Sequence, residues 1–93
     1  LAQARYVPPV EKKSPHTITI NVRKNGNVNI AMQPLTLTQL QQILTATVHE
    51  SGNRIPILIR ADARTLYHEV DRVMEVIGNA GLYRVRLAAV ATP

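Results

Sequence analysis

The chain is 93 residues long, carries a formal net charge of +5 and contains no cysteine. This length allows one small domain, and the absence of cysteine excludes a disulfide framework and a thiolate metal site. Hydrophobic residues make up 45% of the chain and aromatic residues only 3%, so the composition predicts a globular domain with an aliphatic core.

The beginning of the chain differs in pattern from the rest. Residues 1–16 hold three of the six prolines and show no clean periodicity, which predicts an extended tether. Strict alternation of apolar and polar residues then predicts half-buried strands over residues 17–23 and 27–30. Asn25-Gly26 between them favours a tight β-hairpin, because both central residues of a type I′ turn need a positive φ.

A proline and a capping pattern follow the hairpin. Pro34 is expected to break the second strand. Thr36 and Gln39 have the spacing of a capping box. We therefore expect a helix over residues 37–50 that ends before Ser51. Its apolar stripe comprises Leu37, Leu40, Ile43, Leu44 and Val48.

The second half of the chain alternates strand, helix and strand. The apolar run over residues 55–59 predicts a buried central strand that is parallel to a neighbour. A second helix follows, with Gly81 as its left-handed C-cap and Leu82 as the capping contact. Residues 83–87 alternate again and predict the last strand. The apolar face of this second helix comprises Leu66, Val70, Val73, Met74, Ile77 and Ala80.

The element order β-β-α-β-α-β predicts an α+β two-layer sandwich, with both helices on one face of a mixed sheet. The strand alternation requires the opposite face of this sheet to be polar. We expect that face to carry Thr19, Asn21, Arg23, Asn27, Asn29, Arg84 and Arg86.

The ionisable residues do not form a catalytic or metal-binding pattern. Glu69, Asp71 and Glu75 share the exposed side of the second helix, and the histidines are interpreted as surface residues. Acid–base catalysis needs a pair of such groups in reach of one substrate, and no glycine-rich phosphate loop is present. The sequence therefore predicts neither an enzyme nor a cofactor or metal site.

The most distinctive stretch is Ile59-Arg60-Ala61-Asp62 with Tyr67 after it. It follows the central strand, at the sheet edge where open α/β sheets bind ligands. In the alternative interpretation, Asp62 folds the loop by accepting backbone N–H bonds, Thr65 caps the helix and Tyr67 packs as a partly buried residue. The sequence leaves both interpretations open.

At these residues the chain resembles the ExbD/TolR family of biopolymer transport proteins. The resemblance covers about residues 17–90 and is more specific in the second half. The matching features are Ile57-Leu58-Ile59-Arg60-Ala61-Asp62, Tyr67, Val73-Met74, Ala80-Gly81-Leu82 and Val85 with Leu87, together with the Asn25-Gly26 hairpin and the Leu37 to Leu40 spacing.

The resemblance implies an accessory subunit of a proton-driven motor in the cell inner membrane. A single transmembrane helix, which carries the family's proton-carrying Asp, would precede this chain. Residues 1–16 would be the periplasmic linker, and residues 17–93 a periplasmic domain that forms a homodimer. The partners would be an ExbB/TolQ-like channel subunit and either a TonB-like protein or peptidoglycan. The residues expected to bind partners are Arg60, Asp62, Tyr67, Arg84 and Arg86.

A small basic RNA-binding domain is the alternative that the charge leaves open. Against it, no block of like charge is long enough to form a nucleic-acid tail. The predicted sheet also lacks the stacking aromatic residues of RNA-binding sheets. We therefore expect no nucleic-acid partner.

Overall fold

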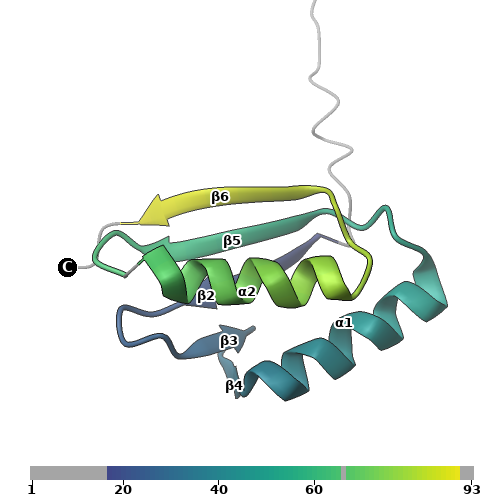
Figure 1. Cartoon of the computed structure of the whole chain (residues 1–93), viewed down its shortest axis with the longest axis horizontal. Helices are drawn as coiled ribbons and strands as arrows, with labels where there is room; N and C mark the ends of the chain where they lie inside the picture. Colours follow the sequence, from purple (N-terminus) through teal and green to yellow (C-terminus); the bar gives the residue numbers. More distant parts are fainter. Residues whose placement is uncertain (1–16, 66, 91–93) are drawn as a thin grey trace, which may run out of the picture.

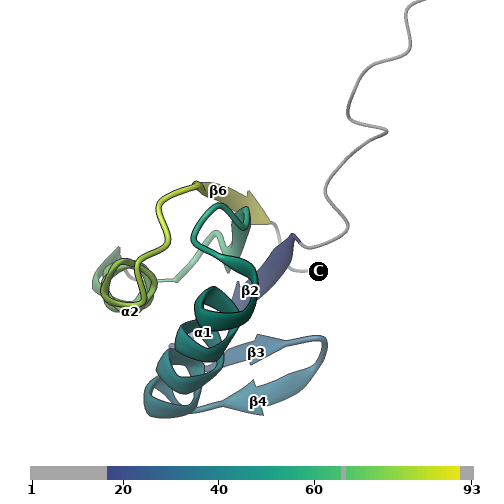
Figure 2. The ribbon, with the colours of Figure 1, turned by 90° about the vertical axis from the view of Figure 1, so that its right-hand side faces the viewer.

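The computed structural model describes residues 17–65 and 67–90. The expected tether over residues 1–16 and the expected contact of Leu66 lie outside this part of the chain. The described residues form an α+β sandwich in which two helices cover one face of a five-stranded mixed sheet (Figures 1 and 2). The elements are β2 (Ile18–Val22), β3 (Val28–Ile30), β4 (Gln33–Leu35), α1 (Leu37–Ser51), β5 (Ile57–Asp62), α2 (Tyr67–Asn79) and β6 (Val85–Val90).

The sheet has the order β4-β3-β2-β5-β6. Its centre is parallel, because β2 and β6 both run in the same direction as β5. Its other part is an antiparallel meander of β2, β3 and β4. The expected parallel central strand is confirmed in β5, whose Ile57 and Ile59 are at most 1% exposed under the helices.

The strand β4 was not predicted from the sequence. Pro34 was expected only to end the preceding strand, whereas it lies within β4. The chain reverses at Ala31 and Met32, with φ values of 51° and 67°, and Pro34 then lies opposite Asn29 in the sheet. Proline is tolerated there because β4 is an edge strand, which needs hydrogen bonds on only one side. The sheet therefore has five strands in place of the expected four.

The β2–β3 hairpin is confirmed, but the expected type I′ turn at Asn25-Gly26 is wrong. Arg23 N donates to Asn27 O at 2.8 Å and Gly26 N donates to Arg23 O at 2.8 Å. Gly26 has a φ of 89°, whereas Asn25 is not among the residues with positive φ. This is the loop type in which a left-handed glycine follows an ordinary turn. The two consecutive positive φ values lie instead at Ala31 and Met32, between β3 and β4.

Helix α1 begins as the sequence predicts. Gln39 N donates to Thr36 Oγ1 at 3.0 Å, and Thr36 N donates to Gln39 Oε1 at 2.8 Å, which completes the capping box. Within the apolar stripe of α1, Leu40 and Leu44 are fully buried, with 0% exposure. Ile43 is 40% exposed and lies at the margin of the buried face. The helix ends at Ser51, one residue beyond the predicted end.

The C-terminal end of α2 has the expected cap. Gly81 has a φ of 95°, its N–H donates to Gly78 O at 2.9 Å, and Leu82 N donates to Ile77 O at 3.2 Å. These two bonds form the Schellman arrangement, which satisfies carbonyl groups in the last helical turn. Leu82 is 4% exposed and joins the core. Met74, expected on the apolar face, is 42% exposed.

The core lies between the helices and one face of the sheet, as the views along and across the sheet show (Figures 1 and 2). In the described part of the chain, every residue classed as buried is apolar. Fully burying one aliphatic side chain contributes about 1.5–3 kcal/mol, so this layer is the main source of stability. The core comprises Ile20, Val22, Val28, Leu40, Leu44, Ile55, Ile57, Ile59, Ala61, Val70, Val73, Ile77 and Leu82.

Candidate functional site

The face of the sheet that the helices leave uncovered is polar, as the alternation predicted. Across its middle, Pro34, Asn29, Asn21, Arg60 and Ala88 follow one another from β4 to β6 as register partners. The Asn21 side chain donates through Nδ2 to Asn29 Oδ1 at 3.0 Å. This bond fixes the amide orientation and leaves further donor and acceptor positions for a ligand.

A hollow of about 660 Å³ opens on this polar face. Its lining residues include four asparagines, the two arginines Arg23 and Arg60, and Asp62. No aromatic residue is among its lining residues, so it offers no platform on which a base could stack. Its lining comprises Asn21, Val22, Arg23, Asn25, Asn27, Val28, Asn29, Met32, Pro34, Arg60, Asp62 and Val90.

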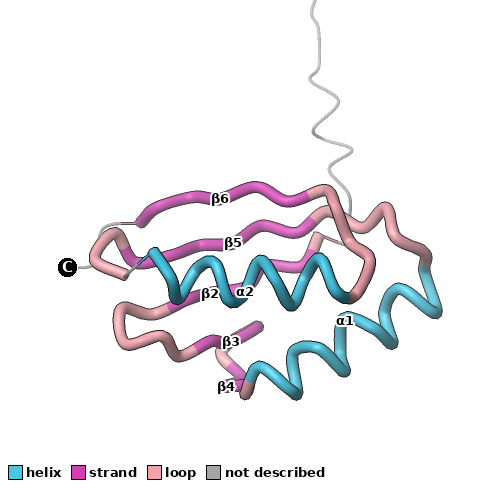
Figure 3. Tube along the Cα trace, viewed as in Figure 1, coloured by secondary structure: helices cyan, strands magenta, loops and turns pink. Residues whose placement is uncertain are grey.

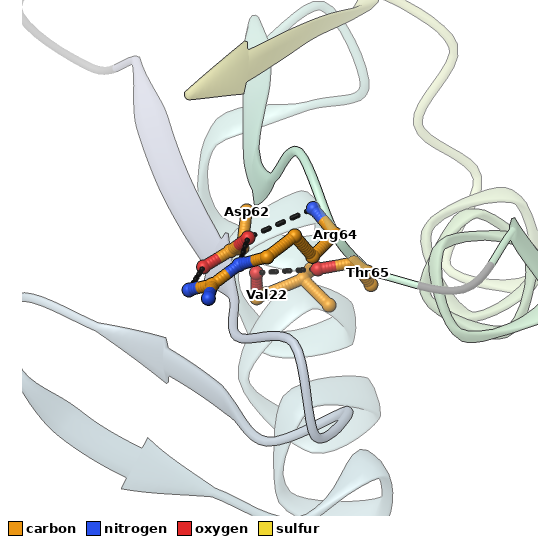
Figure 4. Close-up of polar contacts among 4 residues, drawn as sticks. All are labelled: Val22, Asp62, Arg64 and Thr65. Carbon is orange, nitrogen blue, oxygen red and sulfur yellow. Dashed lines mark hydrogen bonds and ion pairs between the residues drawn. The ribbon is translucent and has the colours of Figure 1, made fainter. Parts of the chain in front are cut away.

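Asp62 organises the loop between β5 and α2 (Figure 4). Its Oδ1 accepts a bond from Arg64 N at 2.8 Å, and its two oxygens accept bonds from Arg64 Nε and Nη2 at 3.1 and 3.0 Å. The Asp62 carbonyl accepts from Thr65 N at 2.8 Å. The hydrogen bonds that the Arg64 guanidinium donates to Asp62, and then the negative charge of Asp62, raise the pKa of Arg64. Asp62 therefore performs the loop-forming role, and Arg64 neutralises its charge.

The start of α2 differs from the second interpretation of this segment. The Thr65 hydroxyl donates to Val22 O at 3.5 Å, which ties the loop to β2 (Figure 4). Tyr67 is the first residue of α2 and is 80% exposed. The expectation that Tyr67 packs as a partly buried residue is wrong.

The strand β6 forms an open margin of the sheet. It pairs with β5 on one side and with no strand of residues 17–65 and 67–90 on the other (Figure 3). Leu87 in the centre of β6 is 56% exposed, and Tyr83, two residues before β6, is 62% exposed. The residue before β6, Arg84, donates through Nη1 to Arg54 O at 3.2 Å.

The structure distributes the predicted partner-binding residues over three places. Arg60 and Asp62 line the hollow. Tyr67 lies beyond the carboxyl end of β5, at the start of α2. Arg86 is the register partner of Leu58 near the start of β6, and Arg84 precedes that strand. These residues therefore do not converge on one site.

Sequence reasoning identified the polar face but not the hollow. Met32 and Pro34, at one side of the hollow, come from the β3–β4 turn and strand that the sequence did not predict. The alternating asparagines in residues 21–29 were the sequence signal for the polar face on which the hollow lies. This signal placed those side chains on one face but gave no information on how the sheet curves.

The described ranges contain no group of three or more His, Cys, Asp or Glu residues that could hold a metal ion. Two carboxylates in this part form ion pairs: Asp62 with Arg64, and Glu69 with Arg72 at 3.9 Å. Within the same ranges, none of the helices is both long and apolar enough to cross a bilayer.

Comparison with known proteins agrees with the resemblance seen in the sequence. A family model described as biopolymer transport protein ExbD/TolR matches residues 2–92. A search of the curated proteins gives no match. Proteins of this family are accessory proteins of transport rather than enzymes. Because the model covers nearly the whole sequence, the chain belongs to the ExbD/TolR family of biopolymer transport proteins.

Proposed function

We propose that this chain is the periplasmic interaction domain of a motor accessory subunit, anchored in the inner membrane by one helix. The family match carries the proposal. The open face and the open margin of the sheet support it, because both leave polar backbone or side-chain groups available to a partner. The proposed anchor would precede residue 1, and residues 1–16 would connect it to the folded domain.

The proposed driving force comes from the membrane. Protons that pass between the anchor helix and an ExbB/TolQ-like channel subunit would move the membrane helices, and the connecting segment would transmit this movement to the sandwich. The proton-carrying carboxylate belongs to the anchor helix in this proposal. The acidic residues of the present chain therefore keep structural or surface roles, as Asp62 does in its loop.

The periplasmic partner would be a TonB-like protein or peptidoglycan, and a second copy of the chain would form the dimer. A protein partner fits the strand edge, where it can add hydrogen bonds to free backbone groups. Peptidoglycan fits the hollow, where Asn21 and Asn29 offer amide groups and Arg23 and Arg60 offer positive charge. These two surfaces make separate predictions for mutation.

Co-purification from membranes tests the proposal. The full-length protein is expected to bring down its channel subunit, and the isolated domain is expected to bind either the TonB-like partner or purified peptidoglycan. Arg60→Ala should weaken peptidoglycan binding if the hollow is used, while Arg86→Ala should weaken a protein partner bound at β6. Failure of the full-length protein to associate with any channel subunit would contradict the proposed function.

A further inference from the structure

The acidic residues lie mainly on the helix side of the sandwich. Of the five acidic residues in residues 17–65 and 67–90, four belong to the helices, namely Glu50, Glu69, Asp71 and Glu75. The fifth, Asp62, borders the hollow on the polar face. Its Oδ2 is 3.0 Å from Arg64 Nη2, so its charge is neutralised. The described residues therefore place no uncompensated negative charge on the polar face.

Arginines occupy this polar face. Arg23, after β2, and Arg60, in β5, both line the hollow. Arg86 lies on the same side of β6 as the register partner of Leu58, and Arg84 shares that side by alternation. All four arginines are exposed, and none forms an ion pair within the described part of the chain. The polar face is thus cationic from the end of β2 to β6.

An exposed apolar side chain borders the same face. Met32 is 90% exposed and is one of the residues that line the hollow. It lies in the β3–β4 turn, where Ala31 and Met32 have φ values of 51° and 67°. A positive φ is unfavourable for residues that carry a Cβ atom, and backbone strain of this kind clusters at binding sites. The turn therefore holds an apolar group in solvent, beside a cationic surface, in a conformation that is itself unfavourable.

We propose that the polar face docks on a bilayer of anionic phospholipid, and that Met32 enters the boundary between the headgroups and the acyl chains. This inference rests on the proposed function, because the proposed anchor holds the chain beside a bilayer. The four arginines would lie over lipid phosphates, and one headgroup would enter the hollow of about 660 Å³ between Arg23 and Arg60. Binding at a membrane surface combines buried apolar area with attraction to anionic lipids.

The distribution of charge favours a bilayer over peptidoglycan as the occupant. The arginines are spread from the hollow to β6 and do not converge on one point. A bilayer presents phosphates across the whole face, whereas a glycan strand crosses it as a narrow line. Met32 gains a contact with acyl chains that a polar glycan does not offer. Sixteen extended residues span at most about 55 Å, so the proposed anchor also keeps the face near the bilayer and raises the effective lipid concentration.

Vesicle co-sedimentation of the 93-residue chain tests the electrostatic part of the proposal. Vesicles that contain phosphatidylglycerol should sediment the chain, less so at high salt, and vesicles of pure phosphatidylcholine should not. Arg60→Gln should weaken binding to the anionic vesicles about fivefold. Gln42→Glu, on the exposed side of α1, changes the net charge equally and should change binding far less. Circular dichroism would verify that both variants fold.

Two variants of Met32 test its insertion. Met32→Asn should weaken vesicle binding but raise Tm, because asparagine adopts a positive φ more readily; a purely structural role would not move the two readouts in opposite directions. The chain contains no cysteine, so Met32→Cys can carry a single environment-sensitive fluorophore. Its emission should shift to shorter wavelength with anionic vesicles, whereas the same label on Gln42→Cys should show no shift.

Three results would overturn the proposal: equal sedimentation with both kinds of vesicle, an unshifted label in the Met32→Cys variant, or sedimentation with purified peptidoglycan but not with anionic vesicles. The outcome can be separated from the proposed function. If the full-length protein still associates with its channel subunit while the 93-residue chain fails to bind anionic vesicles, membrane docking of the polar face is wrong and the motor function stands.

Discussion

Glu69, in the first turn of α2, lies directly over Gly26 in the β2–β3 turn. A Cβ atom at Gly26 would be only 2.6 Å from Glu69 Oε1. The carboxylate is positioned by His68, whose Nε2 is 3.1 Å from Oε2, and by Arg72. This contact joins the second helix to the hairpin across the margin of the core.

The first prediction concerns this contact. Gly26→Ala should lower the free energy of unfolding by about 1–2 kcal/mol, because alanine disfavours the positive φ of Gly26. The substitution should lower the free energy of unfolding further, because the new Cβ atom would force the Glu69 side chain to move. Gly81→Ala is the matched control, since Gly81 also has a positive φ but its Cβ would meet nothing within 4 Å. Chemical denaturation should show a larger loss for Gly26, and Glu69→Ala should make the two losses equal.

The second prediction concerns the β3–β4 turn, where a substitution should stabilise the domain. Ala31 and Met32 both have a positive φ, which costs about 1 kcal/mol or more for each residue that carries a Cβ. Replacing the pair by Asn-Gly should stabilise the domain by about 1 kcal/mol and raise Tm by about 4–8 °C. A calorimetric scan in which Tm falls or stays constant would contradict the geometry of this turn.

The third prediction separates the structural role of Asp62 from partner binding. Asp62→Ala removes the acceptor of the Arg64 N–H and should cost about 1 kcal/mol of stability. Asp62→Asn keeps an acceptor oxygen in that position and should avoid most of this loss. If Asp62→Ala leaves stability unchanged but abolishes binding of a partner, the residue acts in recognition and not in the loop.

The fourth prediction concerns the two apolar residues of α2 that the sequence placed on the same face. Ile77 is 1% exposed and Met74 is 42% exposed. Ile77→Ala should cost about 2–5 kcal/mol because it leaves a cavity in the core. Met74→Ala should cost less than about 1 kcal/mol because Met74 loses little contact. Similar losses in urea unfolding would contradict the orientation of α2.

Much of the fold could be predicted because local patterns and long-range packing agree. The Thr36–Gln39 capping box and the Gly81 cap depend on neighbouring residues alone, and both are present. The apolar run ending at Ile59 required a strand covered on the helix side and bonded on both edges. The extra strand β4 could not be predicted, because its turn uses Ala31 and Met32, residue types that rarely adopt a positive φ.

The candidate site was less predictable than the fold. Alternation placed Asn21, Asn29 and Arg86 on the polar face, as the register confirms. The sequence predicted that β5 is a central strand, but it did not give the full strand order, and only that order shows that β6 is an edge. The partly buried packing role expected for Tyr67 was wrong, because Tyr67 is the first residue of α2 and is 80% exposed.

The most direct test of this account is hydrogen exchange at single residues along β6, with the periplasmic segment of the TonB-like partner added to the domain. Before addition, the amides of Arg86, Ala88 and Val90 should exchange slowly because they face β5, and those of Val85, Leu87 and Ala89 should exchange rapidly. After addition, the second set should become protected. Unchanged exchange in that set, with the partner bound elsewhere on the domain, would contradict the assignment of β6 as the docking edge.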